Sequence, residues 1–158
     1  MNDQQTLDHA NVVVLPPILY LGSLLAGAAV QWFVPVRLPL AEALRWSLGV
    51  LLLGGGLAVA VMFVRAFKRT GQDPHPNTPS ALLITTGLYR YSRNPAYVAF
   101  AVIQLALGLL FNNAWILLAL MPVLLVMHYG VILREEIYLG RKFGEEYLRY
   151  KASVRRWI

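Results

Sequence analysis

The chain has 158 residues, of which 58% are hydrophobic and 14% are charged, and its mean hydropathy is +0.54. A soluble domain averages about 25% charged and about 45–50% apolar residues, so this composition excludes an ordinary soluble enzyme and is typical of a membrane protein. The absence of cysteine excludes disulfides, thiolate zinc sites and cysteine nucleophiles. A membrane surface accounts for the net charge of +6, and no nucleic-acid motif accompanies it.

The first half of the chain contains two uncharged segments that each have the length of a membrane crossing. Residues 12–34 and 46–64 carry no charged side chain, and about 20 apolar residues cross a bilayer core. Within the second segment, Gly54-Gly55-Gly56 would need a strand before it and a helix after it to act as a nucleotide-binding loop, and the sequence provides neither. We interpret the three glycines as a surface that packs closely against another span.

A second apolar region, residues 94–133, is long enough for two more crossings. It has no formally charged residue, and its one amide pair is Asn112-Asn113. This pair divides the region into arms of about 18–20 residues, each just long enough to cross a bilayer core. We therefore predict spans at residues 95–111 and 114–133 that form a tight helical hairpin.

The positions of lysine and arginine predict the orientation of the four spans. Most of them lie in residues 65–93 and after Leu133, whereas residues 35–45 contain two and the Asn112 turn none. Because cytoplasmic loops carry an excess of positive charge, we expect both termini and the 65–93 connection to be cytoplasmic.

After the fourth span, residues 134–156 show the pattern of an amphipathic helix. Apolar and aromatic residues recur three or four positions apart on one face; they are Leu139, Phe143, Tyr147, Tyr150 and Val154. Gly140 and Gly144 weaken such a helix by about 1 kcal/mol each, so we expect a bend or a break near them. The predicted fold is all-α: a single domain, residues 1–158, with four transmembrane helices and a cytoplasmic C-terminal helix. That helix lies on anionic lipid or folds back as a lid over a site.

Two polar groups flank the predicted hairpin, and its topology brings them to the same membrane face. One group opens the third span, and its members are Tyr89, Arg90, Arg93, Asn94 and Tyr97. The other follows the fourth span, and its members are Arg134, Glu135 and Glu136. Asn94 suits a helix N-cap and Pro95 suits the first helical turn, so the third span presents a helix N-terminus, which favours an anion. Arginines, carboxylates and aromatic rings at one membrane surface suit a ligand with an anion, sugar hydroxyls and a flat base.

These residues also have structural interpretations. Arginines at the ends of spans usually set orientation or contact headgroups, and tyrosines at that depth usually belong to the interfacial aromatic belt. Glu135 and Glu136 can pair with Arg141 and Lys142 on a solvated helix face. His128 lies inside the fourth predicted span, either as a functional residue or as a neutral histidine hydrogen-bonded between spans. The three histidines of the chain lack the spacing of metal ligands, so we predict no metal site.

Two blocks of the sequence resemble a known family. The runs TTGLYRYSRNPAYVAF and REEIYLGRKFGEEYLRYKASVRRW, separated by a two-span hairpin, are similar to the isoprenylcysteine carboxyl methyltransferase family, which is related to the membrane phospholipid methyltransferases. The resemblance covers about residues 65–158. The chain differs at Asn94, where many members carry histidine; asparagine keeps hydrogen bonding but cannot take a proton near neutral pH.

The resemblance implies an S-adenosylmethionine-dependent methyltransferase whose cofactor lies at the cytoplasmic ends of the last spans, beneath the C-terminal helix. The implied cofactor-binding residues are Tyr89, Arg93, Asn94, Pro95, Tyr97, Glu135 and Glu136, with His75 and its loop closing the pocket. Arg93 and the helix N-terminus would hold the methionine carboxylate. A glutamate would accept hydrogen bonds from the ribose hydroxyls, and a tyrosine would pack on the adenine or face the sulfonium.

The acceptor implied by the resemblance is a lipid or prenylated molecule that enters from the bilayer and carries a carboxylate or an amine. A carboxylate needs a cation to place it, which Arg134 or Arg149 would provide, whereas an amine must lose a proton, which Glu135 would accept. The sequence leaves both routes open. It also leaves open a membrane sterol reductase that uses NADPH and carries a similar Arg-x-Pro-x-Tyr region, and a non-enzymatic protein with four spans.

Overall fold

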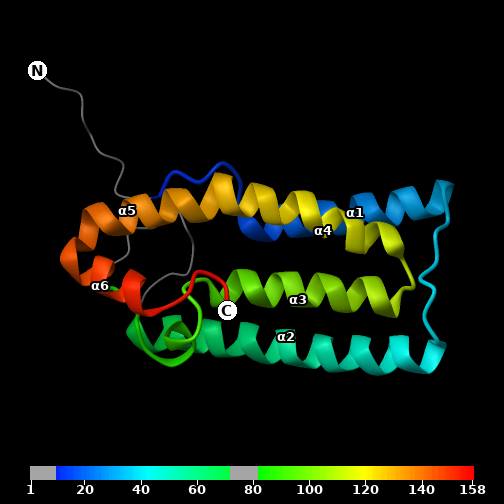
Figure 1. Ribbon diagram of the computed structural model, residues 1–158, viewed down its shortest axis with the longest axis horizontal. Coiled ribbons are helices and arrows are strands. Elements are labelled where there is room, and N and C mark those ends of the chain that lie inside the picture. The colour runs from blue at the N-terminus through cyan, green and yellow to red at the C-terminus, as the bar shows by residue number, and fades with distance from the viewer. Residues whose placement is uncertain (1–9, 72–81) are drawn as a thin grey trace, which may run out of the picture.

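The computed structural model describes residues 10–71 and 82–158, and within these ranges it contains helices and no strand (Figure 1). The fold is therefore all-α, as predicted. The helices in chain order are α1 (Pro16–Phe33), α2 (Glu42–Thr70), the short 3₁₀ helix η1 (Gly87–Arg90), α3 (Pro95–Leu110), α4 (Ala114–Val126), the π-helical turn η2 (Met127–Ile132), α5 (Leu133–Phe143) and α6 (Glu145–Ser153).

Three helical stretches in the described residues are long and apolar enough to cross a membrane: α1, α2 and the continuous run of α4, η2 and α5. Together with the composition, they indicate an integral membrane protein. α3 is apolar but has 16 residues, or about 24 Å of helix, which is shorter than a bilayer core of about 30 Å. A fourth crossing by α3 therefore stays a prediction. In the long run the charged residues begin at Arg134, so α5 lies beyond its apolar part.

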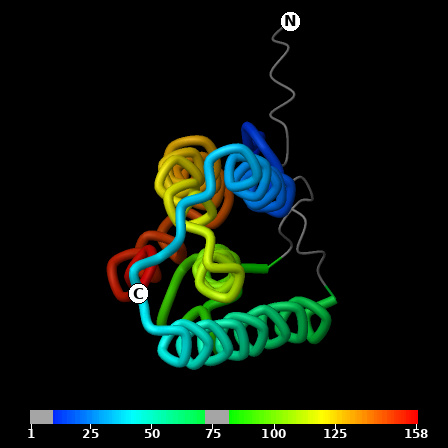
Figure 2. The backbone as a smooth tube through the Cα atoms, turned by 90° about the vertical axis from the view of Figure 1, so that its right-hand side faces the viewer, coloured from blue at the N-terminus to red at the C-terminus, as the bar shows by residue number. Residues whose placement is uncertain are grey.

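α3 lies between the other helices of the bundle. It packs against α2 on one side and α4 on the other, while α1 packs mainly against α4 (Figures 1 and 2). Glycines allow these close approaches: a Cβ on Gly56 of α2 would lie 2.7 Å from Ile103 of α3, and one on Gly27 of α1 would lie 2.9 Å from α4. A Cβ on Gly54 or Gly55 would meet nothing within 4 Å. Of the glycine run, Gly56 alone packs against another helix in the described part of the chain.

Buried polar side chains close the end of the bundle where α3 turns into α4. Nη1 of Arg45, from α2, donates to two carbonyl oxygens at the C-terminal end of α3, at 2.8 and 2.7 Å. Oδ1 of Asn113 accepts from two backbone N–H groups in the first turn of α4 and so caps that helix. The turn between α3 and α4 falls at Asn112 and Asn113, where the amide pair predicted a break.

The run from α4 to α5 is not a regular helix. Pro122 lies inside α4, where it cannot donate a backbone hydrogen bond, and Met127–Ile132 forms a π-helical turn. Such a turn changes the angular register of the residues that follow it, and π turns are frequent at functional sites. Ile132 and the glutamates that follow it in α5 line the cavity described below.

The chain reverses sharply between α5 and α6, at Gly144. Its φ of +54° lies in the left-handed region that favours glycine. The reversal folds α6 and the C-terminal residues back toward the start of α3 (Figure 1). The segment 134–156, predicted as one helix with a bend or break, is thus mostly two helices, and the break falls at Gly144 rather than at Gly140.

Candidate functional site

A cavity of about 480 Å³ lies where the starts of α1 and α3, the end of α2 and the helices α5 and α6 meet. Apolar side chains form one part of its wall; they include Ile18, Phe63, Phe67, Leu82 and Phe100. Polar and charged side chains form the other part; they are Tyr89, Arg93, Asn94, Tyr97, Glu135, Glu136, Tyr138, Tyr147 and Tyr150. The volume lies within the range of about 300–1,000 Å³ that small-molecule sites occupy.

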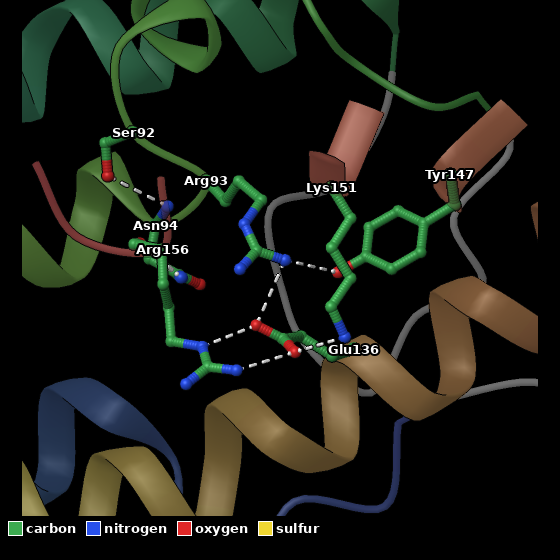
Figure 3. A network of polar contacts seen from close by, with 7 residues as sticks. All are labelled: Ser92, Arg93, Asn94, Glu136, Tyr147, Lys151 and Arg156. Atoms are coloured by element: carbon green, nitrogen blue, oxygen red, sulfur yellow. Dashed lines mark hydrogen bonds and ion pairs between the residues drawn. The ribbon is translucent and has the colours of Figure 1, made fainter. Parts of the chain in front are cut away.

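One carboxylate, that of Glu136, joins three cationic side chains (Figure 3). Its Oε1 lies 3.2 Å from Nη1 of Arg93 and 2.7 Å from Nε of Arg156, and its Oε2 lies 2.9 Å from Nζ of Lys151. Arg156 also donates from Nη2 to Oε2 at 3.0 Å, so its contact with the carboxylate is bidentate. We call these four residues the Glu136 hub; three positive charges and one negative charge give it a net charge of +2.

The hub keeps Glu136 ionised. Burial alone would raise the pKa of this carboxyl group, but hydrogen bonds from Arg156 and Lys151 and the charge of Arg93 outweigh burial and lower the pKa of Glu136 to about 2. The carboxylate is therefore charged throughout the neutral range, and it is fully occupied by protein partners. This environment suits a structural anchor better than a proton carrier.

Glu135 has a different environment from its neighbour, because successive residues of a helix point about 100° apart. Its Oε1 accepts a hydrogen bond from the hydroxyl of Tyr97 at 2.6 Å. Burial raises the pKa of Glu135 to about 7, and the hydrogen bond from Tyr97 only partly opposes this effect. Glu135 can therefore take up or release a proton near neutral pH, inside the cavity.

The C-terminal strap, residues 154–157, holds the loop that precedes α3. The backbone N–H of Arg93 donates to the carbonyl oxygen of Arg155 at 3.0 Å, and Nδ2 of Asn94 donates to that of Arg156 at 2.8 Å. Asn94 occupies the N-cap position of α3, as predicted, but its side chain makes no capping hydrogen bond and contacts the strap instead. Oγ of Ser92 accepts from the Asn94 N–H at 3.1 Å and stabilises the turn before the helix.

Aromatic side chains surround the charged groups. The hydroxyl of Tyr147 accepts from Nη1 of Arg93 at 3.4 Å, and the hydroxyl of Tyr150 donates to the carbonyl oxygen of Tyr89 at 2.8 Å. The rings of Tyr89 and Phe67 lie 6.4 Å apart, centroid to centroid. The faces of such rings can contact a flat base or a cation.

Arg93 retains an unused hydrogen-bond donor. Its side chain is 9% exposed, and its Nε is buried without a hydrogen-bond partner among the described residues. Buried N–H groups are nearly always paired in proteins, and an unpaired one costs about 1–3 kcal/mol. Arg93 also lines the cavity, so a polar side chain with an unused donor belongs to its wall.

The structure brings most of the predicted site residues together. Those that line the cavity are Tyr89, Arg93, Asn94, Pro95, Tyr97, Glu135 and Glu136. Arg134 and Arg149 are exposed and do not line it, and Arg134 donates instead to the carbonyl oxygen of Asn11 at 3.0 Å. His75 lies outside the described residues. His128 lies in η2 and does not line the cavity.

Other residues of the site were not identified from the sequence; they are Lys151 and Arg156 of the hub, Tyr147 and Tyr150 of α6, and Phe63 and Phe67 of α2. A weak signal existed for the two tyrosines, because tyrosine on an apolar helix face usually directs its hydroxyl toward a polar partner. Arg156 is one of seven basic residues after Leu133, and nothing in the local sequence separates it from the other six.

The profile of the phospholipid methyltransferase family matches residues 44–146, more than half of the chain. The chain belongs to this family. A protein-S-isoprenylcysteine O-methyltransferase of Schizosaccharomyces pombe is 32% identical over 108 residues, which make up 68% of the chain and 46% of that protein. An uncharacterized protein of Haemophilus influenzae is 44% identical over 62 residues, which make up 39% of the chain and 98% of that protein.

These matches confirm the family resemblance stated from the sequence. The chain spans about half the length of the Schizosaccharomyces pombe methyltransferase. The family match includes Arg93, Glu135 and Glu136 but ends at residue 146, before Lys151 and Arg156. No solved structure matches the chain.

Proposed function

We propose that this protein transfers a methyl group from S-adenosylmethionine to a lipophilic acceptor at a membrane surface. One observation carries the proposal: a single cavity combines the buried Arg93, with its unused donor, a carboxyl group with a pKa of about 7 and several tyrosines. An apolar wall from α1 and α2 adjoins these groups. Membership of the phospholipid methyltransferase family supports the same conclusion.

The residues present fit the methyl donor. Its carboxylate matches the guanidinium of Arg93, which keeps an unused donor, and the N-terminus of α3, both of which favour an anion. Its adenine matches the faces of Tyr89 and Phe67. When bound, the donor supplies a methyl group that is already activated by a positively charged sulfur.

Because the methyl group is already activated, the main task of the protein is to position the donor and the acceptor. Holding two reactants in line can lower a barrier by roughly 7–11 kcal/mol. Arg93 and the N-terminus of α3 would fix the donor at the polar side of the cavity, while Ile18, Phe63 and Phe100 would hold the apolar part of the acceptor on the other side. The apolar wall would also exclude water from the place where the two meet.

The arrangement in the membrane is also part of the proposal. We propose that α3 crosses together with the three longer helices, so that four crossings place both termini on one side. The cavity lies at the end of the bundle where α2 finishes with Lys68 and Arg69 and where α5 carries Arg141 and Lys142. Under the positive-inside rule this end is cytoplasmic. A water-soluble donor would enter from the cytoplasm and a lipid acceptor from the bilayer.

The charges that line the cavity favour an amine acceptor over a carboxylate. Arg93 is the one lysine or arginine that lines it in the described residues, and residues 1–9 and 72–81 contain neither lysine nor arginine. If Arg93 holds the donor's carboxylate, no second cation remains to place a carboxylate acceptor. Glu135, with its pKa of about 7, would accept the proton that an amine must lose.

The test uses the full-length protein in lipid nanodiscs with methyl-labelled S-adenosylmethionine and a total lipid extract. We expect saturable binding of the donor and transfer of label to the lipid fraction. Alkali should not release this label as volatile methanol, because N-methyl groups survive alkali whereas methyl esters release methanol. Release of labelled methanol would contradict the amine acceptor but not methyl transfer. No binding of the donor in either lipid or detergent would contradict the proposed function itself.

A further inference from the structure

We propose that Arg156 of the C-terminal strap is a positioning residue that keeps Arg93 available for an anionic ligand. It does so by occupying the carboxylate of Glu136 so completely that Arg93 keeps one donor unpaired. The inference rests on the proposed function, because the anion concerned is the carboxylate of the methyl donor. It gives a role to a segment that lies beyond the family match, which ends at residue 146.

The distances show how the two arginines share the carboxylate (Figure 3). Arg156 uses two nitrogens, Nε to Oε1 at 2.7 Å and Nη2 to Oε2 at 3.0 Å. Arg93 reaches Oε1 with Nη1 alone, at the longer distance of 3.2 Å. Lys151 takes Oε2 at 2.9 Å. Glu136 thus forms a bidentate contact with Arg156 and a single, longer contact with Arg93.

The remaining contacts of Arg93 leave its Nε unpaired. Nη1 also donates to the hydroxyl of Tyr147 at 3.4 Å, while Nε has no partner. A carboxylate and a guanidinium pair most favourably through two parallel hydrogen bonds. Without Arg156, Glu136 would turn toward Arg93 and engage it in this way. Arg93, a residue that lines the cavity, would then lose its unpaired donor to an internal ion pair.

The strap is tied to the same place by its backbone, which supports a specific role for its side chain. The carbonyl oxygens of Arg155 and Arg156 accept from Arg93 N–H and from Asn94 Nδ2, at 3.0 and 2.8 Å. These bonds do not depend on the side chain of either strap residue. A substitution at Arg156 therefore removes the ion pair while the strap keeps its attachment to the loop before α3.

The test compares two ligands, only one of which carries the amino-acid carboxylate that Arg93 is proposed to bind. S-adenosylhomocysteine carries the amino-acid carboxylate, and 5′-methylthioadenosine keeps the adenosine but lacks that carboxylate. Their dissociation constants are measured by calorimetry on the full-length protein in nanodiscs. Arg156→Gln should weaken S-adenosylhomocysteine by at least about tenfold, the effect of losing a charge-assisted hydrogen bond, and leave 5′-methylthioadenosine unchanged within about twofold.

Arg155→Gln is the matched control, because it removes the same charge one residue away from an exposed side chain. We expect it to leave both ligands unchanged. Arg156→Lys provides a second variant if Arg156→Gln folds poorly, because lysine keeps the charge but cannot form the bidentate contact; it too should weaken only S-adenosylhomocysteine.

Three results would overturn the assignment. Equal weakening of both ligands by Arg156→Gln would indicate a general loss of structure. No change for either ligand would show that Arg93 is not held through the hub. Failure of the unmodified protein to bind either ligand would overturn the proposed function and this inference with it, whereas the first two results would leave the proposed function intact.

Discussion

The two ends of α3 each hold a buried arginine from a neighbouring segment, and the two are satisfied in different ways. At the C-terminal end, Arg45 donates to the carbonyl oxygens of Leu109 and Leu110. At the N-terminal end, Arg93 contacts the side chains of Glu136 and Tyr147, and its Nε has no partner among the described residues. Arg45 thus pairs with carbonyl oxygens at a helix end, whereas Arg93 keeps an unpaired donor and lines the cavity.

The helix dipole makes the contrast sharper. A cation at a helix C-terminus is stabilised by about 0.3–1 kcal/mol, and a cation at an N-terminus is disfavoured by a similar amount. Arg45 lies at the favourable end of α3, and Arg93 lies at the unfavourable end together with Lys151 and Arg156. Glu136 offsets part of this positive charge and leaves the hub with a net charge of +2. Under the proposed function, Arg45 serves the fold and Arg93 serves a ligand.

The largest effect that this comparison predicts is on binding and activity at the N-terminal end. Arg93→Gln should weaken binding of the methyl donor, and lower methyl transfer at limiting donor, by about 10²–10³-fold, because it removes one partner of the expected charge pair with the donor's carboxylate. Stability should change little, because Lys151 and Arg156 still compensate Glu136. Donor binding, transfer rate and thermal unfolding are measured on the same preparation. Arg90→Gln, at an exposed arginine three residues earlier, serves as the control and should retain activity.

A second prediction concerns the proton acceptor at the same end. Glu135→Gln should lower the transfer rate by about 10²-fold, the usual contribution of a general base. In the unmodified protein the rate should rise as the pH increases through about 7, because Glu135 must be ionised to accept a proton. The variant should lose this rise. A rate that stays flat across pH 6–8 in the unmodified protein would contradict a role for Glu135 as the base.

The same shift in pKa has the opposite consequence for stability, which provides an independent check. The pKa of Glu135 rises from 4.5 to about 7 on folding, so the folded state holds the proton more tightly than the unfolded state. Its contribution to stability is full below about pH 4.5 and is lost as the pH rises to about 7. Thermal unfolding of Glu135→Gln should therefore show a smaller decline over this interval than the unmodified protein.

At the other end of α3, substitution should change stability and leave binding unchanged. Arg45→Leu removes both hydrogen bonds to Leu109 and Leu110 and leaves their carbonyl oxygens unpaired, at a cost of about 1–3 kcal/mol. Unfolding in a detergent titration measures the loss, and donor affinity is measured alongside it. Arg37→Leu, an exposed arginine in the connection before α2, is the control. A large loss of donor affinity in Arg45→Leu would contradict the division between the two ends.

The sequence predicted the parts of this comparison that depend on length and topology. Uncharged runs located the long helices, and Asn112-Asn113 located the turn between α3 and α4. Because a hairpin returns the chain to its starting side, it also placed Arg93 near Glu135 and Glu136, and the structure joins Arg93 and Glu136 at 3.2 Å. These inferences needed only the spacing of the charged residues and the position of one amide pair.

The directions of the side chains in α5 and the path of the C-terminal strap could not be predicted from the sequence. Arg134 and Glu135 are neighbours, yet a helix turns by about 100° per residue, so the arginine faces outward while the glutamate lines the cavity. Arg156 reaches Glu136 because the chain reverses at Gly144 and the strap then returns to the start of α3. A reversal of this kind depends on tertiary packing, which composition and periodicity do not describe.

The last prediction concerns the packing of α2 against α3, between the two ends of α3. Gly56→Val should destabilise the protein by about 1–3 kcal/mol, the usual cost of overpacking, because its new Cβ would lie 2.7 Å from Ile103 and 3.3 Å from the carbonyl oxygen of Ala99. Gly54→Val is the matched control, since a Cβ there meets nothing within 4 Å.

Both variants add the same side chain to the same helix, so their difference in unfolding free energy isolates the contact with α3. Gly54→Val should be near neutral, because valine and glycine differ little in helix propensity. Donor affinity should fall in Gly56→Val only to the extent that α2 shifts Phe63 and Phe67 at the cavity wall. If both variants were equally destabilised, α2 would have a second packing partner on its Gly54 face, such as another copy of the chain.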